Sequence, residues 1–172
     1  MTPDQLRQVM PYSAGKVADF AQPLTDAMAE FAIDTARRRA AFLAQVAQES
    51  GELRYMREIA SGQAYEGRAD LGNTQPGDGP LFRGGGLLMV TGRANFTSCG
   101  EALGVELASS PGLIETPSIA CRSAAWFWST HRLNELADGD NFGQITHFIN
   151  GGYNGLDSRL RYWLVARKLE NL

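Results

Sequence analysis

The stretch FLAQVAQESGELRYMRE, from Phe42 to Glu58, decides the fold of this chain. In its first half Phe42, Val46 and Glu49 recur at steps of four and three, which is the period of an amphipathic helix. We therefore predict a helix over about residues 35–50, capped by a polar side chain at its start and followed by a glycine. Glu49 then lies in the last helical turn, partly among apolar side chains.

Glu49 and Glu58 form a candidate catalytic pair. An apolar setting at the C-terminal end of a helix favours the protonated form of Glu49, which a general acid needs. Glu58 follows the break at Gly51, on a segment that we expect to be wetter. One carboxyl group in an apolar niche and one in a polar setting is the arrangement used in glycoside hydrolysis. The spacing alone leaves a second interpretation open, because most glutamates near helix ends are solvated surface charges.

Composition and charge narrow the class of protein. The chain has 172 residues, of which 44% are hydrophobic, so we expect a single domain over residues 1–172 with a sizeable core. A net charge of −3 argues against a nucleic-acid-binding protein. No apolar run reaches the roughly 18 residues of a membrane span. No signal-peptide pattern is evident at the N-terminus, so we expect synthesis in the cytoplasm and no stable membrane insertion.

Metal, disulfide and nucleophile chemistry find little support in the sequence. Cys99 and Cys121 are its two cysteines, and we expect buried, reduced thiols, with a disulfide between them as the alternative. His131 and His147 stand in no ligand pattern, so we expect no metal and no cofactor. There is no Gly-x-Ser-x-Gly motif and no cysteine in a protease context. The two glutamates therefore remain the best candidates.

Helical periodicity dominates the rest of the chain, which predicts a mainly α fold with a loop-rich middle. We expect a short first helix opened by Thr2 and Pro3, and a second one capped by Ser13 and interrupted or restarted at Pro23. Glycine and proline cluster over residues 61–86, which predicts a long ordered loop.

The last third of the chain predicts three further helices. They cover a buried segment over about 119–130 capped by Ser118, a segment over about 141–150, and a final one from about Ser158.

Four islands of the sequence resemble the plant-type chitinase family, glycoside hydrolase family 19, and most closely its short phage and prophage endolysins. The islands are FLAQVAQESG (42–51), Glu58, the segment with YEGR (65–68), LGNTQPGDG (71–79) and FRGGGLLMVTGRANF (82–96), and INGGYNG (149–155) with RLRY (159–162). Together they span about residues 29–169, and the combination is far more specific than any single island.

The resemblance implies a lysozyme-like, two-lobed helical fold with a cleft between the lobes, and an inverting mechanism. Glu49 matches the general acid that protonates the glycosidic oxygen, and Glu58 matches the general base that activates a water on the far face of the sugar. Thr91 matches a hydroxyl residue that helps to position this water, and Asn95 matches a sugar-binding amide.

Further site residues follow from the same resemblance. Asn150 and Arg159 match residues that line the cleft and tie Glu58 into a polar network, where an arginine would keep this carboxylate ionised. Three more residues are expected in the cleft: Tyr65, Arg68 and Asn73.

Three positions depart from the usual family pattern. Gly85 stands where the family usually has arginine, Met89 replaces a glutamine, and Gln48 replaces a histidine. Methionine removes a hydrogen-bond donor and an acceptor and leaves a soft apolar side chain. These departures are compatible with a changed substrate, weakened catalysis or a degenerate copy.

The resemblance predicts an endolysin that cuts the β-1,4 glycan strands of peptidoglycan and acts on the cell wall after holin-dependent release. We expect a monomer that binds no nucleic acid. A chitinase that acts on chitin or its oligosaccharides is one alternative. A glycan-binding relative that has lost turnover is the other.

Overall fold

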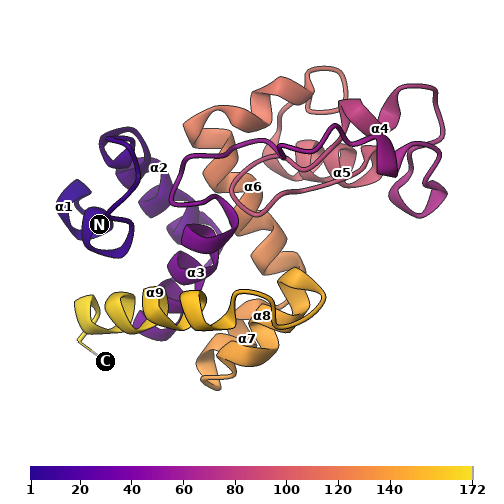
Figure 1. Ribbon diagram of the computed structural model, residues 1–172. Coiled ribbons are helices and arrows are strands. Elements are labelled where there is room, and N and C mark those ends of the chain that lie inside the picture. Colours follow the sequence, from indigo (N-terminus) through magenta and orange to yellow (C-terminus); the bar gives the residue numbers. More distant parts are fainter. Residues whose placement is uncertain (172) are drawn as a thin grey trace.

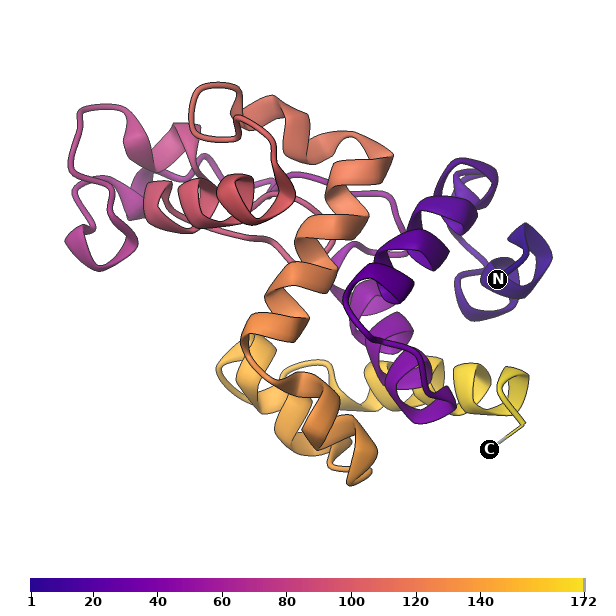
Figure 2. The same ribbon diagram turned by 180° about the vertical axis from the view of Figure 1, so that it is seen from behind.

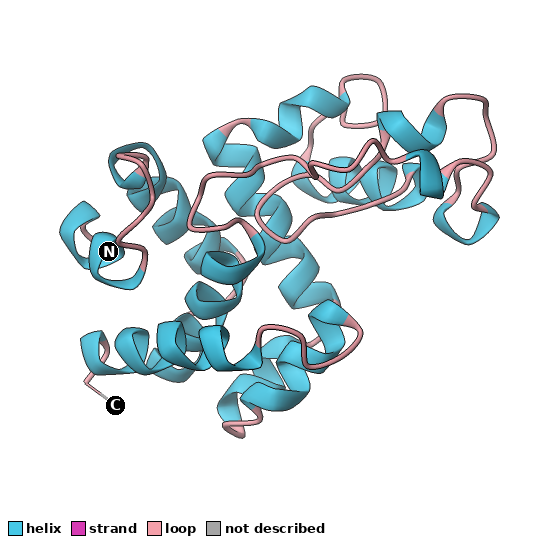
Figure 3. Ribbon diagram, viewed as in Figure 1, coloured by secondary structure: helices cyan, strands magenta, loops and turns pink. Residues whose placement is uncertain are grey.

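The computed structural model describes residues 1–171 and is mainly helical (Figures 1 and 3). Its helices are α1 (Pro3–Val9), α2 (Val17–Glu30), α3 (Ala36–Glu49), α4 (Asp78–Leu81), α5 (Arg93–Leu103), α6 (Pro117–Thr130), α7 (Leu133–Asp138), α8 (Phe142–Asn150) and α9 (Leu156–Leu169), with short 3-10 turns η1 (Gln63–Tyr65), η2 (Ala69–Leu71) and η3 (Pro111–Glu115). Within residues 1–171 extended pairing is limited to isolated bridges from Gly85 to Arg57 and Val90. The predicted mainly α class is confirmed.

The first two helices agree only in part with the sequence-based expectation. Thr2 and Gln5 form a reciprocal capping box at the start of α1, as its Thr-Pro opening predicts. The cap predicted at Ser13 is wrong, because α2 begins after Lys16 without a side-chain cap. Pro23 does not interrupt α2 but lies inside it. The carbonyl that loses its partner belongs to Asp19, an exposed residue, which keeps the cost of the missing hydrogen bond low.

Helix α3 has the predicted bounds. Thr35 Oγ1 accepts a hydrogen bond from the Arg38 N–H at 3.2 Å and caps its start. Ser50 ends it, since its hydroxyl donates to the Val46 carbonyl and accepts from the Leu53 N–H. Glu49 is therefore the last helical residue, and Gly51 follows it with a positive φ of 56°.

Two hydrophobic cores divide the molecule into two lobes that share α6. In the larger core Phe42 of α3 packs edge-on against Trp128 of α6, with ring centroids 5.4 Å apart. In the smaller core Phe82 packs against Phe96 of α5 at 5.3 Å, with Trp126 of α6 beside them. Figure 2 shows α6 running from the α5 side of the molecule to the α7–α8 side. The two-lobed helical arrangement predicted from the resemblance is confirmed.

The glycine-rich middle of the chain is ordered mainly by buried polar contacts. Asp78, 1% exposed, accepts two hydrogen bonds from the Arg93 guanidinium, and this pairing holds the pKa of its carboxyl below the usual value. Glu66 accepts from the N–H groups of Gly77 and Gly79 at 2.7 Å. A Cβ on Gly79 would lie 2.5 Å from the Glu66 nitrogen, so only glycine fits this close approach.

The last third of the chain follows the prediction with shifted boundaries. Helix α6 begins at Pro117 after Thr116, so the cap predicted at Ser118 is wrong. The short helix α7 was not expected, because its six residues are too few for a clear period. No helix in the described part of the chain is long and apolar enough to cross a membrane.

Both cysteines are buried and free, as predicted. Burial raises the pKa of the Cys99 thiol to about 12 and also raises that of Cys121.

Candidate active site

The two predicted catalytic carboxylates line the same open hollow. It has a volume of about 310 Å³ and is lined by the end of α3, the segment that follows it and the Gly-rich turn, with Glu49, Tyr55, Arg57, Glu58, Ile59, Ala60 and Met89 on its walls. Tyr55 and Ile59 are exposed, at 43% and 80%. A polymer strand can therefore reach both carboxylates from solvent. We call this space the catalytic hollow, after the two predicted catalytic carboxylates that line it.

Glu49 is held from the helical lobe. Its side chain is 21% exposed, and its Oε1 lies 2.5 Å from Nη2 of Arg159, whose side chain is only 3% exposed. Arg159 comes from α9, and it also donates through Nη1 to Oε1 of Gln45, one turn before Glu49 on α3. Gln45 in turn donates to Thr146 Oγ1 of α8 at 2.9 Å. Three helices thus fix the position of one carboxylate.

Gln45 and Thr146 are site residues that the sequence reasoning missed. Both are fully buried polar residues, and buried polar groups are costly unless they are hydrogen-bonded. A polar residue on an otherwise apolar helix face, four positions before Glu49, was the available signal. Gln48, which departs from the family pattern, is half-buried and accepts a hydrogen bond from the Ser158 hydroxyl of α9.

The expected pairing of Arg159 with Glu58 is wrong, since the guanidinium binds Glu49 instead. The expected apolar setting of Glu49 is wrong for the same reason, because its carboxyl group has a cationic partner. Within residues 1–171, no arginine or lysine nitrogen lies within ion-pair distance of Glu58. The sequence could not decide this, because α9 crosses α3 and the side-chain direction of Arg159 depends on that packing.

Glu58 is held from the loop-rich lobe by neutral donors. Tyr65 donates its hydroxyl to Oε1 at 3.1 Å, and the Gly84 N–H donates to Oε2 at 3.1 Å. The Glu58 backbone also donates to the Gly84 carbonyl at 2.8 Å. Burial and the hydrogen bond to Glu58 raise the pKa of Tyr65, so its hydroxyl stays a donor at neutral pH. Tyr65, which was expected in the cleft, thus contacts Glu58 directly.

Thr91 and Asn95 lie in a neighbouring pocket rather than in the catalytic hollow. This pocket has a volume of about 190 Å³ and is lined by Leu71, Met89, Val90, Thr91, Asn95, Trp126, Phe127 and His131. Met89 lines both spaces and has a positive φ of 52°. Thr91 Oγ1 donates to the Met89 carbonyl at 2.9 Å, and Asn95 Nδ2 donates to the Thr91 carbonyl at 2.8 Å. The two predicted polar residues therefore also hold the turn that carries Met89.

The remaining predicted site residues, Asn150, Arg68 and Asn73, differ in their burial and hydrogen bonding. Asn150 ends α8, and its buried Nδ2 has no hydrogen-bond partner within the described chain, which leaves a donor free. Arg68 is exposed and forms a bidentate pair with Asp70, away from the walls of the hollow. Asn73 is 0% exposed and bridges the Tyr65 carbonyl and the Arg93 N–H, so its expected role in the cleft is wrong.

Gly85 has no room for the arginine that usually stands there in the family. A Cβ at this position would lie 2.6 Å from Cγ2 of Ile114 and 3.2 Å from the ring of Phe96. The smaller core thus occupies the space of the missing side chain. Ile114 and Phe96 fill the space beside Gly85, so the neighbouring side chains fit glycine at this position and not arginine.

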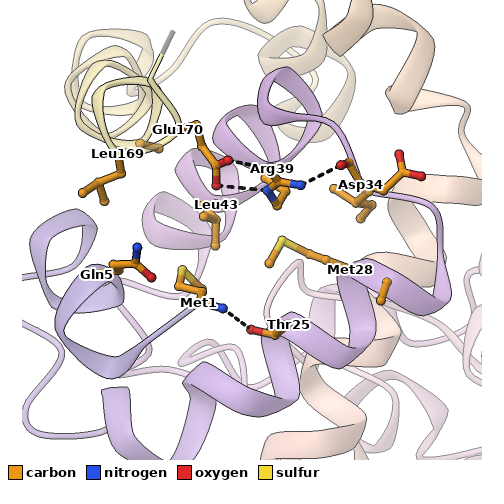
Figure 4. A pocket seen from close by; sticks show the side chains of 12 residues that line it. Met1, Gln5, Thr25, Met28, Asp34, Arg39, Leu43, Leu169 and Glu170 are labelled. Atoms are coloured by element: carbon orange, nitrogen blue, oxygen red, sulfur yellow. Dashed lines mark hydrogen bonds and ion pairs between the residues drawn. The ribbon is translucent and has the colours of Figure 1, made fainter.

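A second hollow lies away from the predicted site (Figure 4). It has a volume of about 300 Å³, and Met1, Met28, Leu43 and Leu169 give it an apolar lining. The ion pair of Arg39 with Glu170, at 2.5 Å, lies on its wall. None of the predicted site residues lines it. Within residues 1–171 no group of three or more His, Cys, Asp or Glu side chains is placed to hold a metal ion.

Comparison with known proteins agrees with the lysozyme-like, mainly helical fold. The sequence profile of the family described as chitinase class I matches residues 21–142. The chain belongs to glycoside hydrolase family 19. The matched range contains both Glu49 and Glu58 and ends before Arg159, so the profile does not reach the guanidinium that binds Glu49.

Named relatives and solved structures of family 19 extend the comparison. The chain is 29% identical over 116 residues to a glycosyl hydrolase family 19 domain-containing protein of Haemophilus influenzae, covering 66% of this chain and 55% of the relative. It is 36% identical over 117 residues to an endochitinase of Arabidopsis thaliana, covering 67% and 40%. The chain thus spans about half the length of these curated relatives.

The fold similarity covers nearly the whole chain. A crystal structure described as a bacterial family 19 chitinase superimposes with a TM-score of 0.79 at 22% identity, over 99% of this chain and 95% of the other. Chitinase C from Streptomyces griseus gives a TM-score of 0.74 at 24% identity, over 99% and 76%.

Proposed function

We propose that this family 19 protein hydrolyses the β-1,4 glycan strands of bacterial peptidoglycan by an inverting acid/base mechanism. The observation that carries the proposal is the pair of carboxylates in one open hollow, each held by its own set of donors. The close resemblance of the sequence islands to phage and prophage endolysins supports peptidoglycan as the substrate.

The proposed reaction uses Glu49 and Glu58 in opposite roles. Protonated Glu49 donates its proton to the glycosidic oxygen as the bond from this oxygen to the anomeric carbon breaks. A water attacks the anomeric carbon from the opposite face and gives its proton to Glu58. The products are a free hydroxyl on one sugar and an inverted hemiacetal on the other, and proton exchange with solvent restores both carboxyl groups.

Arg159 and Tyr65 support these two roles. The Glu49 carboxylate that remains after proton donation lies beside the Arg159 guanidinium, which stabilises the developing negative charge. Tyr65 and the Gly84 N–H fix both oxygens of Glu58 and so orient the carboxylate that receives the proton.

The experiment compares wild type with Glu49→Gln on Gram-negative cells stripped of their outer membrane and on chitin oligomers. We expect wild type to clear the cells and to release fragments with new sugar reducing ends, and the variant to be slower by about 10²–10⁴-fold. Glu101→Gln, an exposed glutamate of α5 outside the hollow, is the matched control and should behave as wild type.

Two outcomes would replace the proposal. Release of sugar from chitin oligomers without release from peptidoglycan would assign a chitinase, the activity for which the similar plant and bacterial proteins are named. No release from either polymer by a folded protein that still binds glycan would assign a binding module, with Met89 as the departure next to Glu58.

The proposal includes the route to the substrate, namely synthesis in the cytoplasm and release to the wall through a separate holin. Lysis of cells that express the chain together with a holin, and no lysis with the chain alone, is the expected result. Lysis by the chain alone would contradict this route.

A further inference from the structure

One face beside the catalytic hollow carries positive charges that have no acidic partner. Most arginines of the described chain pair with a carboxylate within 4.0 Å, as Arg39 does with Glu170. Lys16, Arg54 and Arg161 form no such pair within residues 1–171. Arg54 and Arg161 are exposed, and Lys16 is half-buried. These three residues are called the cationic rim below.

Hydrogen bonds bring the cationic rim together from three parts of the chain. Lys16 Nζ donates to the Arg54 carbonyl at 3.4 Å. Tyr162, next to Arg161 on α9, donates to Oε1 of Glu52 at 2.8 Å, and Oε2 of Glu52 accepts from the Tyr12 N–H at 2.5 Å. Glu52 thus links α9 and the segment before α2 to the residues that follow α3.

The charge of Glu52 does not cancel the cationic rim at the surface. Its side chain is 4% exposed, and both of its oxygens are occupied by Tyr12 and Tyr162. Burial and the bond to Glu52 raise the pKa of Tyr162 to about 12, whereas the charges of Arg54 and Arg161 act to lower it. Arg54 follows Glu52 by two residues and Arg161 precedes Tyr162, so the hydrogen bond between Glu52 and Tyr162 brings their two segments together.

The cationic rim is continuous with the catalytic hollow through Tyr55. The Arg54 guanidinium carbon lies 5.8 Å from the centre of the Tyr55 ring, and Tyr55 lines the hollow together with Glu49 and Glu58. A polymer bound at the two carboxylates therefore passes close to Arg54. Arg161 lies on the same side of the chain as Arg54 through its neighbour Tyr162, which is bonded to Glu52, two residues before Arg54.

We propose that the cationic rim binds the carboxylates of the peptide stems that peptidoglycan carries. This inference rests on the proposed function, since it names the feature of the substrate that the chain distinguishes. Chitin is a neutral polymer, whereas the peptide stems of peptidoglycan bear free carboxylates on alternate sugars. Guanidinium groups match carboxylates in charge and geometry, and complementary charge speeds association.

The test measures binding with Glu49→Gln as the non-cleaving background. Arg54→Gln/Arg161→Gln is added to it and compared by co-sedimentation on intact sacculi and on sacculi whose peptide-stem carboxylates have been converted to neutral amides. We expect binding to intact sacculi to weaken about 3- to 10-fold and binding to amidated sacculi to stay the same. The difference should shrink at about 0.5 M salt, where exposed charges are screened.

Controls separate this effect from damage to the fold. Arg37→Gln removes a half-exposed arginine at the other end of α3 and should change neither binding. Arg161→Gln alone, whose side chain makes no hydrogen bond within the described residues, should give part of the loss with an unchanged melting temperature. An equal loss on both kinds of sacculi, or no loss on either, would overturn the inference.

Two further outcomes are informative. Loss of binding to phosphatidylglycerol vesicles with undiminished binding to sacculi would overturn the inference in favour of a membrane surface. Cleavage of chitin alone by the wild type would refute the proposed function, while the sacculus measurement would still decide whether the cationic rim binds peptide stems.

Discussion

The two walls of the catalytic hollow hold their carboxylates by different means. Glu49 lies at the end of a regular helix and is fixed by the buried charge of Arg159. Glu58 lies in irregular chain and is fixed by a phenol and a backbone N–H. The position of Glu49 therefore depends on helix packing, and the position of Glu58 depends on the close approach of loops. Substitutions in the two walls should therefore fail in different ways.

The largest effect is expected from Arg159→Gln in the helical wall. Removing one partner of a buried ion pair costs about 3–5 kcal/mol, and here Gln45 also loses its donor. For a chain of this size we expect the melting temperature to fall by about 10 °C, together with a loss of glycan cleavage. Arg161→Gln, two residues further along the same helix and exposed, is the control, and an equal fall in both variants would contradict the account.

Gly85→Arg, which restores the usual family residue, should destabilise the loop wall. The new side chain must displace Ile114 or Phe96 in the smaller core, and overpacking of this kind costs about 1–3 kcal/mol. Denaturant unfolding of Gly85→Arg and the smaller Gly85→Ala measures the cost, which should increase with side-chain size. A variant as stable as wild type, with higher activity, would show that the space at Gly85 is open.

A smaller effect is expected from Tyr65→Phe. Glu58 then keeps the Gly84 N–H but loses the Tyr65 hydroxyl, a hydrogen bond to a charged group that contributes roughly 1.5 kcal/mol. Cleavage at saturating substrate should fall by about tenfold because Glu58 is less well oriented, and the melting temperature should fall by about 5 °C. Tyr12→Phe, whose ring is 73% exposed, provides the matched control. An unchanged rate for Tyr65→Phe would separate Tyr65 from the function of Glu58.

The smallest expected change is a pH dependence of stability in the loop wall. Arg93 lowers the pKa of Asp78, so this carboxylate stabilises the fold above its unfolded pKa of about 3.9. This stabilisation is lost as the pH falls through the lower pKa of the folded state. Melting temperatures of Asp78→Asn and wild type should therefore differ at pH 7, and the difference should narrow as the pH falls below about 3.9. A gap that stays constant from pH 7 to pH 3 would contradict the assignment.

The helical wall was largely predictable from the sequence, and the loop wall was not. The period of Phe42, Val46 and Glu49, with the flanking cap signals, placed α3 to within one residue at each end, because a helix repeats every few residues along the chain. Glu58 was a candidate from its place in the sequence, and its role as general base came from the family resemblance. Its contacts with Tyr65 and Gly84 depend on turns between segments far apart in sequence, which carry no period.

The errors in the predicted site have a common physical cause. Arg159 was assigned to Glu58 and Asn73 to the cleft, and in each case the residue type was suitable but the direction of the side chain was unknown. The packing of α9 on α3 turns Arg159 toward Glu49. Asn73 is turned inward because its side-chain amide donates a hydrogen bond to the Tyr65 carbonyl and accepts one from the Arg93 N–H. Tertiary contacts, which local sequence does not encode, decided both.

The central claim is that Glu49 and Glu58 act from opposite faces of the sugar. The most direct test is the anomeric configuration of the first product, followed by NMR while a β-1,4-linked N-acetylated glycan oligomer is cleaved, before mutarotation equilibrates the anomers. We expect the α-anomer, because water activated by Glu58 attacks the face opposite the bond that Glu49 protonates. Initial formation of the β-anomer would rule out inversion, since it requires net retention, as through a covalent intermediate.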